Sequence, residues 1–421
     1  MPAGRPPESA TSFGQCYGQA SRRCHAAGSI FGVLLLVLLA ACSNPYDRHE
    51  QMVRAFAAND NLSIQDISLD YSGRRLAFTF SEGRDGHALI ERIALADLDK
   101  GIAWIPDLGA RRYGWHSPSF DRQGERLVLI SSCVWTGCPP EHKGSHIAVN
   151  SLTSGRLDYL TRGERTLVWD LASGKDCVRL ANRKLYRDTP IFSPSGDRIY
   201  YLASANALTS WSRGNARHGS IRVLELSSGV DRGLLDDRSD AVYFPFESAL
   251  ASYGEDRVVV FGGPGACGTR EQEFEQSRAF GYLIGPSEGR LEVLFDGSDY
   301  PGKRQPNIAI LLTTLTASLD GRRLAYVLRQ STRSGRAVRS IVLWEDGAKR
   351  TVATARDFEW WSIGDLAMSG DGRRLAVIGR SMTYSGDQRT FWMVDLETGQ
   401  RREYPLTPLL RQALDSTGQA G

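Results

Sequence analysis

Residues 192–202 read FSPSGDRIYYL, and this stretch decides the fold. A short polar turn with a glycine, Ser193 to Gly196, leads through Arg198 into a nearly continuous apolar run. A glycine in such a turn supplies the positive φ that tight hairpins require, and a continuous apolar run is typical of a strand buried on both faces. The stretch therefore predicts a turn that opens an interior strand of a sheet.

The same pattern recurs along the chain, with one copy (residues 251–261) shifted by one position. Its six arginines are Arg75, Arg126, Arg198, Arg257, Arg323 and Arg374. A second unit, made of a strand, an acidic or small turn with glycine and another strand, follows the first, as at 93–101, 147–155, 221–229, 341–347 and 391–399. Four antiparallel strands repeated six times are the signature of a β-propeller. We therefore predict an all-β fold, a six-bladed β-propeller over residues 62–405.

One segment complicates the blade count. Residues 166–180, TLVWDLASGKDCVRL, form an extra predicted hairpin inside the longest interval between two repeats. This hairpin is either an insertion in a six-bladed ring or part of a degenerate seventh blade. Residues 406–421 follow the last repeat and are predicted as a C-terminal tail.

The repeat resembles that of the TolB-like, or WD40-like, propellers, whose consensus runs F-S-P-D-G-x-x-[IL]-[AV]-[FY]. Residues 192–200 are the copy most similar to it. The resemblance extends over roughly residues 62–405 and implies the propeller fold; it says little about function. The α/β domain that precedes the propeller of TolB itself is expected to be absent from this chain.

The N-terminal region has the features of a secretory signal. The apolar run from Ile30 to Ala41 is about a dozen residues long, whereas a membrane-spanning helix needs roughly 20. It follows Arg22 and Arg23 and ends in small residues, as signal peptides do. Residues 1–41 are therefore predicted to be a signal peptide; the alternative is an uncleaved signal anchor.

The end of this signal, Leu39-Ala40-Ala41-Cys42, resembles the bacterial lipobox. The resemblance implies that the Cys42 thiol is acylated and that the peptide is cleaved before it, so that residues 42–61 tether the propeller to a bilayer. Ser43 after the cysteine is similar to the pattern of outer-membrane lipoproteins. The chain is thus expected in the cell envelope, anchored by lipid to the outer membrane and facing the periplasm.

The net charge of the chain argues against a nucleic-acid partner. The formal net charge of the whole chain is only +3, and removal of residues 1–41 brings it closer to zero. Such a balance gives no case for nucleic-acid binding.

Cys133 and Cys138 lie close together in one predicted loop and are a candidate disulfide, which an oxidising periplasm favours. With His142 and His146 they also form a C-x4-C-x3-H-x3-H run, which holds the ligand types of a tetrahedral zinc site. The spacing matches no common zinc finger, and we predict the disulfide, with no metal and no cofactor.

The predicted topology places the turns within each strand pair on one face and the longer loops on the other. These loops are 81–90, 133–145, 204–219, 262–278, 329–339 and 379–389, and together they carry more Lys and Arg than Asp and Glu. Loops carry binding residues more often than scaffolds do, and aromatic residues and arginine are frequent anchors. The candidate binding residues are Trp135, Trp211, Arg213, Arg217, Arg333, Arg336 and Tyr384. The expected partner is an envelope protein or an anionic envelope polymer.

No catalytic residues are predicted, because the chain shows no G-x-S-x-G nucleophile elbow, P-loop or dinucleotide-binding glycine run. The primary expectation is a non-catalytic binding or scaffold lipoprotein. An enzyme acting on envelope glycans, a hydrolase or lyase with its site in the central channel, and an outer-membrane assembly factor are the alternatives. A channel-facing cluster of at least three carboxylates or histidines would favour the enzyme.

Overall fold

A computed structural model describes the repeat region and the C-terminal segment. The described residues are 62–82, 90–109, 114–133, 139–162, 166–169, 180–184, 186–204, 217–234, 243–244, 250–254, 257–262, 280–284, 291–296, 308–332, 337–358, 362–383 and 386–418. All of them belong to one compact unit, Asp60–Gly421. The predicted signal peptide and tether lie outside the described residues.

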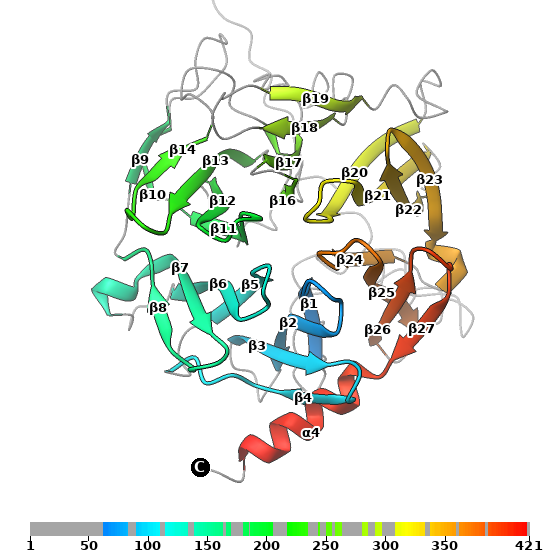
Figure 1. Ribbon diagram of the computed structural model, residues 1–421, viewed down its shortest axis with the longest axis horizontal. Helices are drawn as coiled ribbons and strands as arrows, with labels where there is room; N and C mark the ends of the chain where they lie inside the picture. Colours follow the sequence, from blue (N-terminus) through cyan, green and yellow to red (C-terminus); the bar gives the residue numbers. More distant parts are fainter. Residues whose placement is uncertain are drawn as a thin grey trace, which may run out of the picture. The chain divides into compact units, whose positions relative to one another are not determined.

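Within the described residues, six antiparallel sheets follow one another along the chain, and each is built from consecutive strands (Figure 1). Blade 1 holds β1 (Leu62–Leu69), β2 (Arg75–Glu82), β3 (Ile90–Asp97) and β4 (Ile102–Trp104). Blade 2 holds β5 (Gly114–Phe120), β6 (Arg126–Cys133), β7 (Gly144–Ser151) and β8 (Leu157–Tyr159), with the 3-10 turn η2 (Pro140–His142) before β7. Blade 3 holds β11 (Tyr186–Phe192), β12 (Arg198–Ser204), β13 (Arg217–Glu225) and β14 (Asp231–Gly233), and β15 (Tyr243–Phe244) also pairs with β13.

The second half of the chain repeats this plan. Blade 4 holds β16 (Leu250–Tyr253), β17 (Arg257–Gly262), β18 (Phe280–Ile284) and β19 (Leu291–Asp296). Blade 5 holds β20 (Ile308–Ala317), β21 (Arg323–Thr332), β22 (Ala337–Glu345) and β23 (Ala348–Thr354), followed by the 3-10 turn η4 (Ala355–Phe358). Blade 6 holds β24 (Ser362–Met368), β25 (Arg374–Thr383), β26 (Gly386–Asp395) and β27 (Arg401–Tyr404), and the helix α4 (Leu406–Gly418) ends the described chain.

The repeated turn behaves as predicted. The second strand of every blade begins at the repeat arginine. The glycine of each turn has a positive φ, from 56° to 75°; these are Gly73, Gly124, Gly196, Gly254, Gly321 and Gly372. An L-residue other than Asn or Asp rarely adopts this region, so the turns require glycine.

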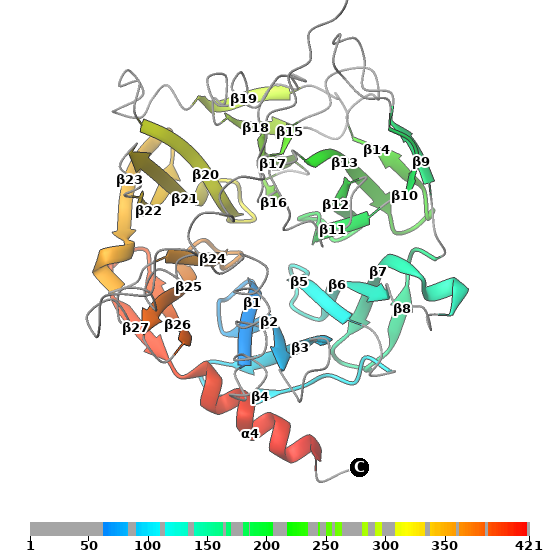
Figure 2. The same ribbon diagram turned by 180° about the vertical axis from the view of Figure 1, so that it is seen from behind.

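The six sheets stand around a common centre (Figure 2). A hydrophobic core fills each junction between neighbours. In β6, Leu127 and Leu129 pack toward blade 1, whereas Val128 and Ile130 pack toward blade 3. Because alternate side chains enter two different cores, these interior strands must be apolar at every position. The predicted six-bladed propeller is therefore confirmed.

The extra hairpin is an insertion. β9 (Thr166–Trp169) pairs with β10 (Leu180–Lys184) in a separate two-stranded sheet, so the described residues provide no seventh blade there.

Two predicted long loops are wrong. In 329–339, β21 runs to Thr332 and β22 starts at Ala337; in 379–389, β25 runs to Thr383 and β26 starts at Gly386. Polar side chains suggested loops there, but backbone pairing between neighbouring strands does not depend on apolar side chains.

The predicted tail, 406–421, is also more structured than its sequence suggested, since α4 packs on the ring. Among the described residues, no helix has the length and apolarity needed to cross a bilayer.

Candidate functional site

The innermost strands of the six blades surround a central channel. They are β1, β5, β11, β16, β20 and β24, and they meet at the middle of the ring (Figure 1). The cavity between them has a volume of about 490 Å³. This volume lies in the range of small-molecule and peptide side-chain sites, so the channel can hold a ligand.

Irregular backbone shapes the channel wall. The register shifts by one residue within β1, β5, β11, β20 and β24. Four residues that line the cavity have positive φ at these bulges: Asp66, Ser117, Thr189 and Thr314. Each such residue costs on the order of 1 kcal/mol, so the neighbouring blades must hold it in place.

The channel wall is acidic. Asp66, Asp121, Asp188 and Asp365 line the cavity, and the described lining residues include no Lys, Arg or His. None of the long-loop residues predicted to form a basic binding surface is among these described lining residues. Charges of one sign between low-dielectric walls concentrate the electric field.

Asp66 is a buried carboxyl group of this wall with a raised pKa. Burial raises its pKa to about 6; the carboxylates of Asp188 and Glu91 act in the same direction, and His116 opposes them. The Asp66 Oδ2 accepts a hydrogen bond from the Ser117 amide at 3.3 Å. The carboxyl group therefore titrates close to neutral pH, where its charge is sensitive to what occupies the channel.

The channel carboxylates also join neighbouring blades. The Ser117 Oγ, on blade 2, donates to the Asp188 Oδ1 on blade 3 at 3.2 Å. The Ile67 amide, on blade 1, donates to the Asp365 Oδ2 on blade 6 at 2.8 Å. These bonds hold the wall in place, and a carboxylate group can accept about four hydrogen bonds over its two oxygens.

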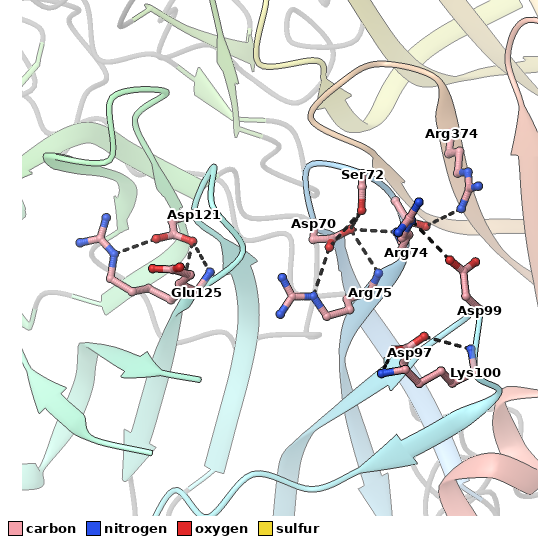
Figure 3. Close-up of polar contacts among 12 residues, drawn as sticks. Asp70, Ser72, Arg74, Arg75, Asp97, Asp99, Lys100, Asp121, Glu125 and Arg374 are labelled. Atoms are coloured by element: carbon pink, nitrogen blue, oxygen red, sulfur yellow. Dashed lines mark hydrogen bonds and ion pairs between the residues drawn. The ribbon is translucent and has the colours of Figure 1, made fainter. Parts of the chain in front are cut away.

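A second ring of polar contacts lies at the turns. In Figure 3 the Asp70 carboxylate accepts the Arg74 and Arg75 amides at 2.9 and 3.1 Å, and it pairs with the Arg75 Nε at 3.2 Å. Asp121 repeats the arrangement on blade 2, where its Oδ2 lies 2.8 Å from the Arg126 Nε. Both aspartates are buried, so they hold the turns in place. Asp121 contributes to the wall of the channel as well.

The repeat arginine reaches beyond its own blade. The Arg126 Nη2 donates to the Gly196 carbonyl of blade 3 at 2.9 Å, and the Arg323 Nη1 donates to the Gly372 carbonyl of blade 6 at 2.8 Å. The repeat arginines at these turns therefore link one blade to the next.

The predicted loop residues are not brought together by the described structure. Arg217 is the first residue of β13, where its backbone pairs with Phe244. The other six candidates lie outside the described residues, as does Cys42; they are Trp135, Trp211, Arg213, Arg333, Arg336 and Tyr384. The loop site stays a prediction.

The structure describes only one of the two cysteines of the predicted disulfide. Cys133 is buried at the end of β6 and is disulfide-bonded. Cys138 and every other cysteine lie outside the described residues, so the pairing of Cys133 with Cys138 stays a prediction. A disulfide sulfur is no thiolate ligand, which argues against the zinc alternative. The described residues contain no group of three potential metal ligands.

The sequence also carries a signal for the channel that lies outside its recognised motifs. The residue seven positions before the turn glycine lines the channel in five blades: Asp66, Ser117, Thr189, Thr314 and Asp365. A polar residue at the same position of several repeats indicates a shared inner surface.

Comparisons with known proteins bear on the fold. No protein-family model and no curated protein matches the sequence. TolB from Acinetobacter baumannii has a similar structure, with 12% identity and a TM-score of 0.42; the match covers 81% of this chain and 62% of that one. An oligogalacturonate lyase from Vibrio parahaemolyticus is 10% identical, with a TM-score of 0.47; the match covers 82% of this chain and 80% of that one. An acylaminoacyl peptidase from Pyrococcus horikoshii is 11% identical, with a TM-score of 0.48; the match covers 83% of this chain and 53% of that one. The likeness of the chain to these proteins is one of fold alone.

Proposed function

We propose that this protein is a lipid-anchored, non-catalytic binding module of the bacterial envelope whose channel takes a cationic segment of an envelope protein. The observation that supports the proposal is the channel itself. Four aspartates line its cavity of about 490 Å³, and no basic residue stands among the described lining residues. A lysine or arginine side chain entering this space forms charge-assisted hydrogen bonds with the carboxylates.

The bonding of these carboxylates favours a binding role over catalysis. Asp365 accepts the amides of Ile67 and Leu366, each at 2.8 Å. Asp188 accepts the Thr189 amide at 2.8 Å as well as the Ser117 hydroxyl. These bonds fix the orientation of both carboxylates, and fixed carboxylates are suited to hold a cationic side chain through charge-assisted hydrogen bonds.

Binding can be tested with fluorescent hexalysine and, as a control, hexaglutamate. We expect hexalysine alone to bind, and its affinity to fall as salt is added. Asp188→Asn is expected to weaken binding by about tenfold, since one charge-assisted contact is lost. Asp158→Asn, at an exposed position of β8, is the matched control and leaves binding unchanged. Absence of hexalysine binding at low salt, or equal losses in both variants, contradicts the proposal.

The anchor and the location form a separate part of the proposal. Acylation of Cys42 would hold the chain at the outer membrane, with the propeller in the periplasm and the lipid as its membrane contact. Mass spectrometry of the mature N-terminus tests this, and Cys42→Ser should release the protein from membranes. An unmodified Cys42 within an uncleaved N-terminus overturns the lipid anchor.

The predicted basic binding residues can be tested independently of the channel. If Arg333 and Arg336, between β21 and β22, contact a second, anionic envelope partner, replacing both by Glu changes the proteins or polymers captured from envelope extracts. An unchanged set removes this part of the proposal.

One observation favours the enzyme as a second candidate. Asp66, with a pKa of about 6, stands near Asp188 and His116, and such a group can act as a general acid near neutral pH. The candidate reaction is hydrolysis or elimination in an envelope glycan. Turnover of purified envelope glycans that Asp66→Asn abolishes would support this candidate, and no turnover by the wild type would exclude it.

A further inference from the structure

The segment that follows the outermost strand of a blade packs into the next junction. Leu108, after β4, lies in the core between blades 1 and 2, and Leu234, after β14, lies in the core between blades 3 and 4. Phe358, in η4 after β23, lies in the core between blades 5 and 6. In these three junctions the same segment is the covalent link to the next blade.

The junction between blades 6 and 1 has no such link, because these blades are the two ends of the ring in sequence. Helix α4 occupies the corresponding place. Leu406 and Leu410 lie in the core of this junction together with Phe78 of blade 1 and Phe391 of blade 6. The helix leaves blade 6 directly after β27 and runs along β4 of blade 1 (Figure 1 and Figure 2).

The helix is built to pack on one side only. Leu406, Leu410 and Ala413 are 3%, 0% and 2% exposed, whereas Arg411 and Gln412 face solvent. The spacing of the buried residues follows one face of a helix. Partly buried Ala103 and Ile105, at the outer edge of blade 1, pack against the same core. The contact therefore joins the outer parts of the first and last blades.

The hydrogen bonds across this junction lie at the innermost strands and turns. The Ile67 amide meets Asp365, the Asp371 amide donates to the Tyr71 carbonyl at 3.0 Å, and Arg374 reaches Gly73. At the junction of blades 5 and 6 the outer strand β23 is bonded to blade 6, since the Arg350 Nη2 donates at 2.9 Å to the carbonyl of Leu396, in the turn after β26.

An open pocket of about 230 Å³ lies at the root of the helix, and its lining includes Ile64, Ile378, Tyr404 and Leu406. The first turn of α4 is therefore bordered by open space as well as by the junction core.

We propose that α4 is a releasable clasp that replaces the missing covalent link between blades 6 and 1. When docked, it holds the outer part of blade 1 against blade 6. When released, it loosens this junction while the other five stay closed. A helix of 13 residues is marginal in isolation, so docking and helix formation occur together.

Hydrogen exchange of the full chain tests the clasp. Leu410→Asp puts a charge into the junction core, and Gln412→Asp puts the same charge on the exposed face of α4 as the matched control. We expect exchange in β1 and β4 to be at least about tenfold faster in Leu410→Asp, with β6 and β12 unaffected. The control is expected to behave as the wild type.

Leu410→Ala is a milder second variant, and it tests the clasp if Leu410→Asp does not fold. It should show the same selective loss of protection in β1 and β4, to a smaller degree. The clasp is overturned if the hydrogen-exchange rate of the variants rises as much in β6 and β12 as in β1 and β4, or if it does not rise in β1 and β4. The readout does not involve the channel ligand, so it is independent of the proposed function.

Discussion

The Nη1 of Arg374 donates to the carbonyl oxygen of Gly73 at 3.2 Å, although the two residues stand 301 positions apart in the chain. Arg126 and Arg323 make the same bond to the turn of the following blade. The contact that links sequential blades is therefore also the contact that closes the ring. The same arginine motif closes the ring because, in space, blade 1 is the next neighbour of blade 6.

Arg374→Ala is expected to lower the free energy of unfolding by about 1–2 kcal/mol, because a charge-assisted hydrogen bond across the closing junction is lost. Urea denaturation measures the change. Arg373→Ala is the control: the side chain is 67% exposed and pairs with Glu397 on the surface, so its loss should change stability by at most about 0.5 kcal/mol. Equal effects of the two substitutions contradict the role of Arg374.

Gly321→Ala is expected to destabilise the protein by more than Gly155→Ala. Both glycines have a φ near +70°, so alanine costs about 1 kcal/mol at either position. At Gly321 a Cβ would also lie 2.8 Å from the Gly254 Cα of the neighbouring blade, whereas Gly155 faces open space. We expect a further loss of about 1–3 kcal/mol at Gly321. Thermal unfolding of the two variants measures the difference, and equal melting temperatures would show that the turns are not tightly apposed.

Asp66 should make the fold less stable as pH rises. Its pKa is raised from 3.8 to about 6, so the folded state holds the proton more tightly than the unfolded state. The stabilisation is complete below about pH 4 and is lost as pH rises through about 6, by an amount on the order of 2 kcal/mol. Asp66→Asn retains an acceptor for the Ser117 amide but does not titrate. Its stability relative to the wild type should therefore be greater at pH 7 than at pH 4.5, and a constant difference in urea denaturation would refute the assignment.

Asp231→Ala is expected to destabilise blade 3 by about 3–5 kcal/mol, because the buried guanidinium of Arg222 loses its carboxylate. The Arg222 Nε lies 2.9 Å from the Asp231 Oδ1, and the Tyr201 hydroxyl donates to the same carboxylate at 2.8 Å. Both side chains of the ion pair are at most 10% exposed.

Glu225→Ala, which removes the partner of Arg232 in a more exposed pair, is the control and should cost less than about 1 kcal/mol. Comparable losses of unfolding free energy in the two variants would show that burial does not strengthen the Asp231 pair.

The blades could be predicted because their determinants are local. The turn around Gly196 and the strand that starts at Arg198 depend on φ preferences and on alternation of side chains within about ten residues. The same reasoning failed for 329–339 and 379–389, where the polarity of side chains hid strands that pair through their backbones.

The candidate site was harder to predict for a physical reason. Asp66 and Asp365 stand in short strands with no motif around them, and they become neighbours of the same cavity only when blades 1 and 6 meet. Charge and aromatic content favoured the loops, which lie largely outside the described residues. The channel was recognisable only through one polar position shared by several repeats.

Short-range chemistry in the chain was sufficient to set the turns, the buried strands and the number of blades, since each repeat encodes its own hairpins. The closure of the ring, the acidic wall and the place of α4 were decided by the folded molecule. They depend on residues distant in the chain becoming neighbours, such as Ile67 and Asp365 at 298 positions apart, and no local stretch of the sequence specifies those contacts.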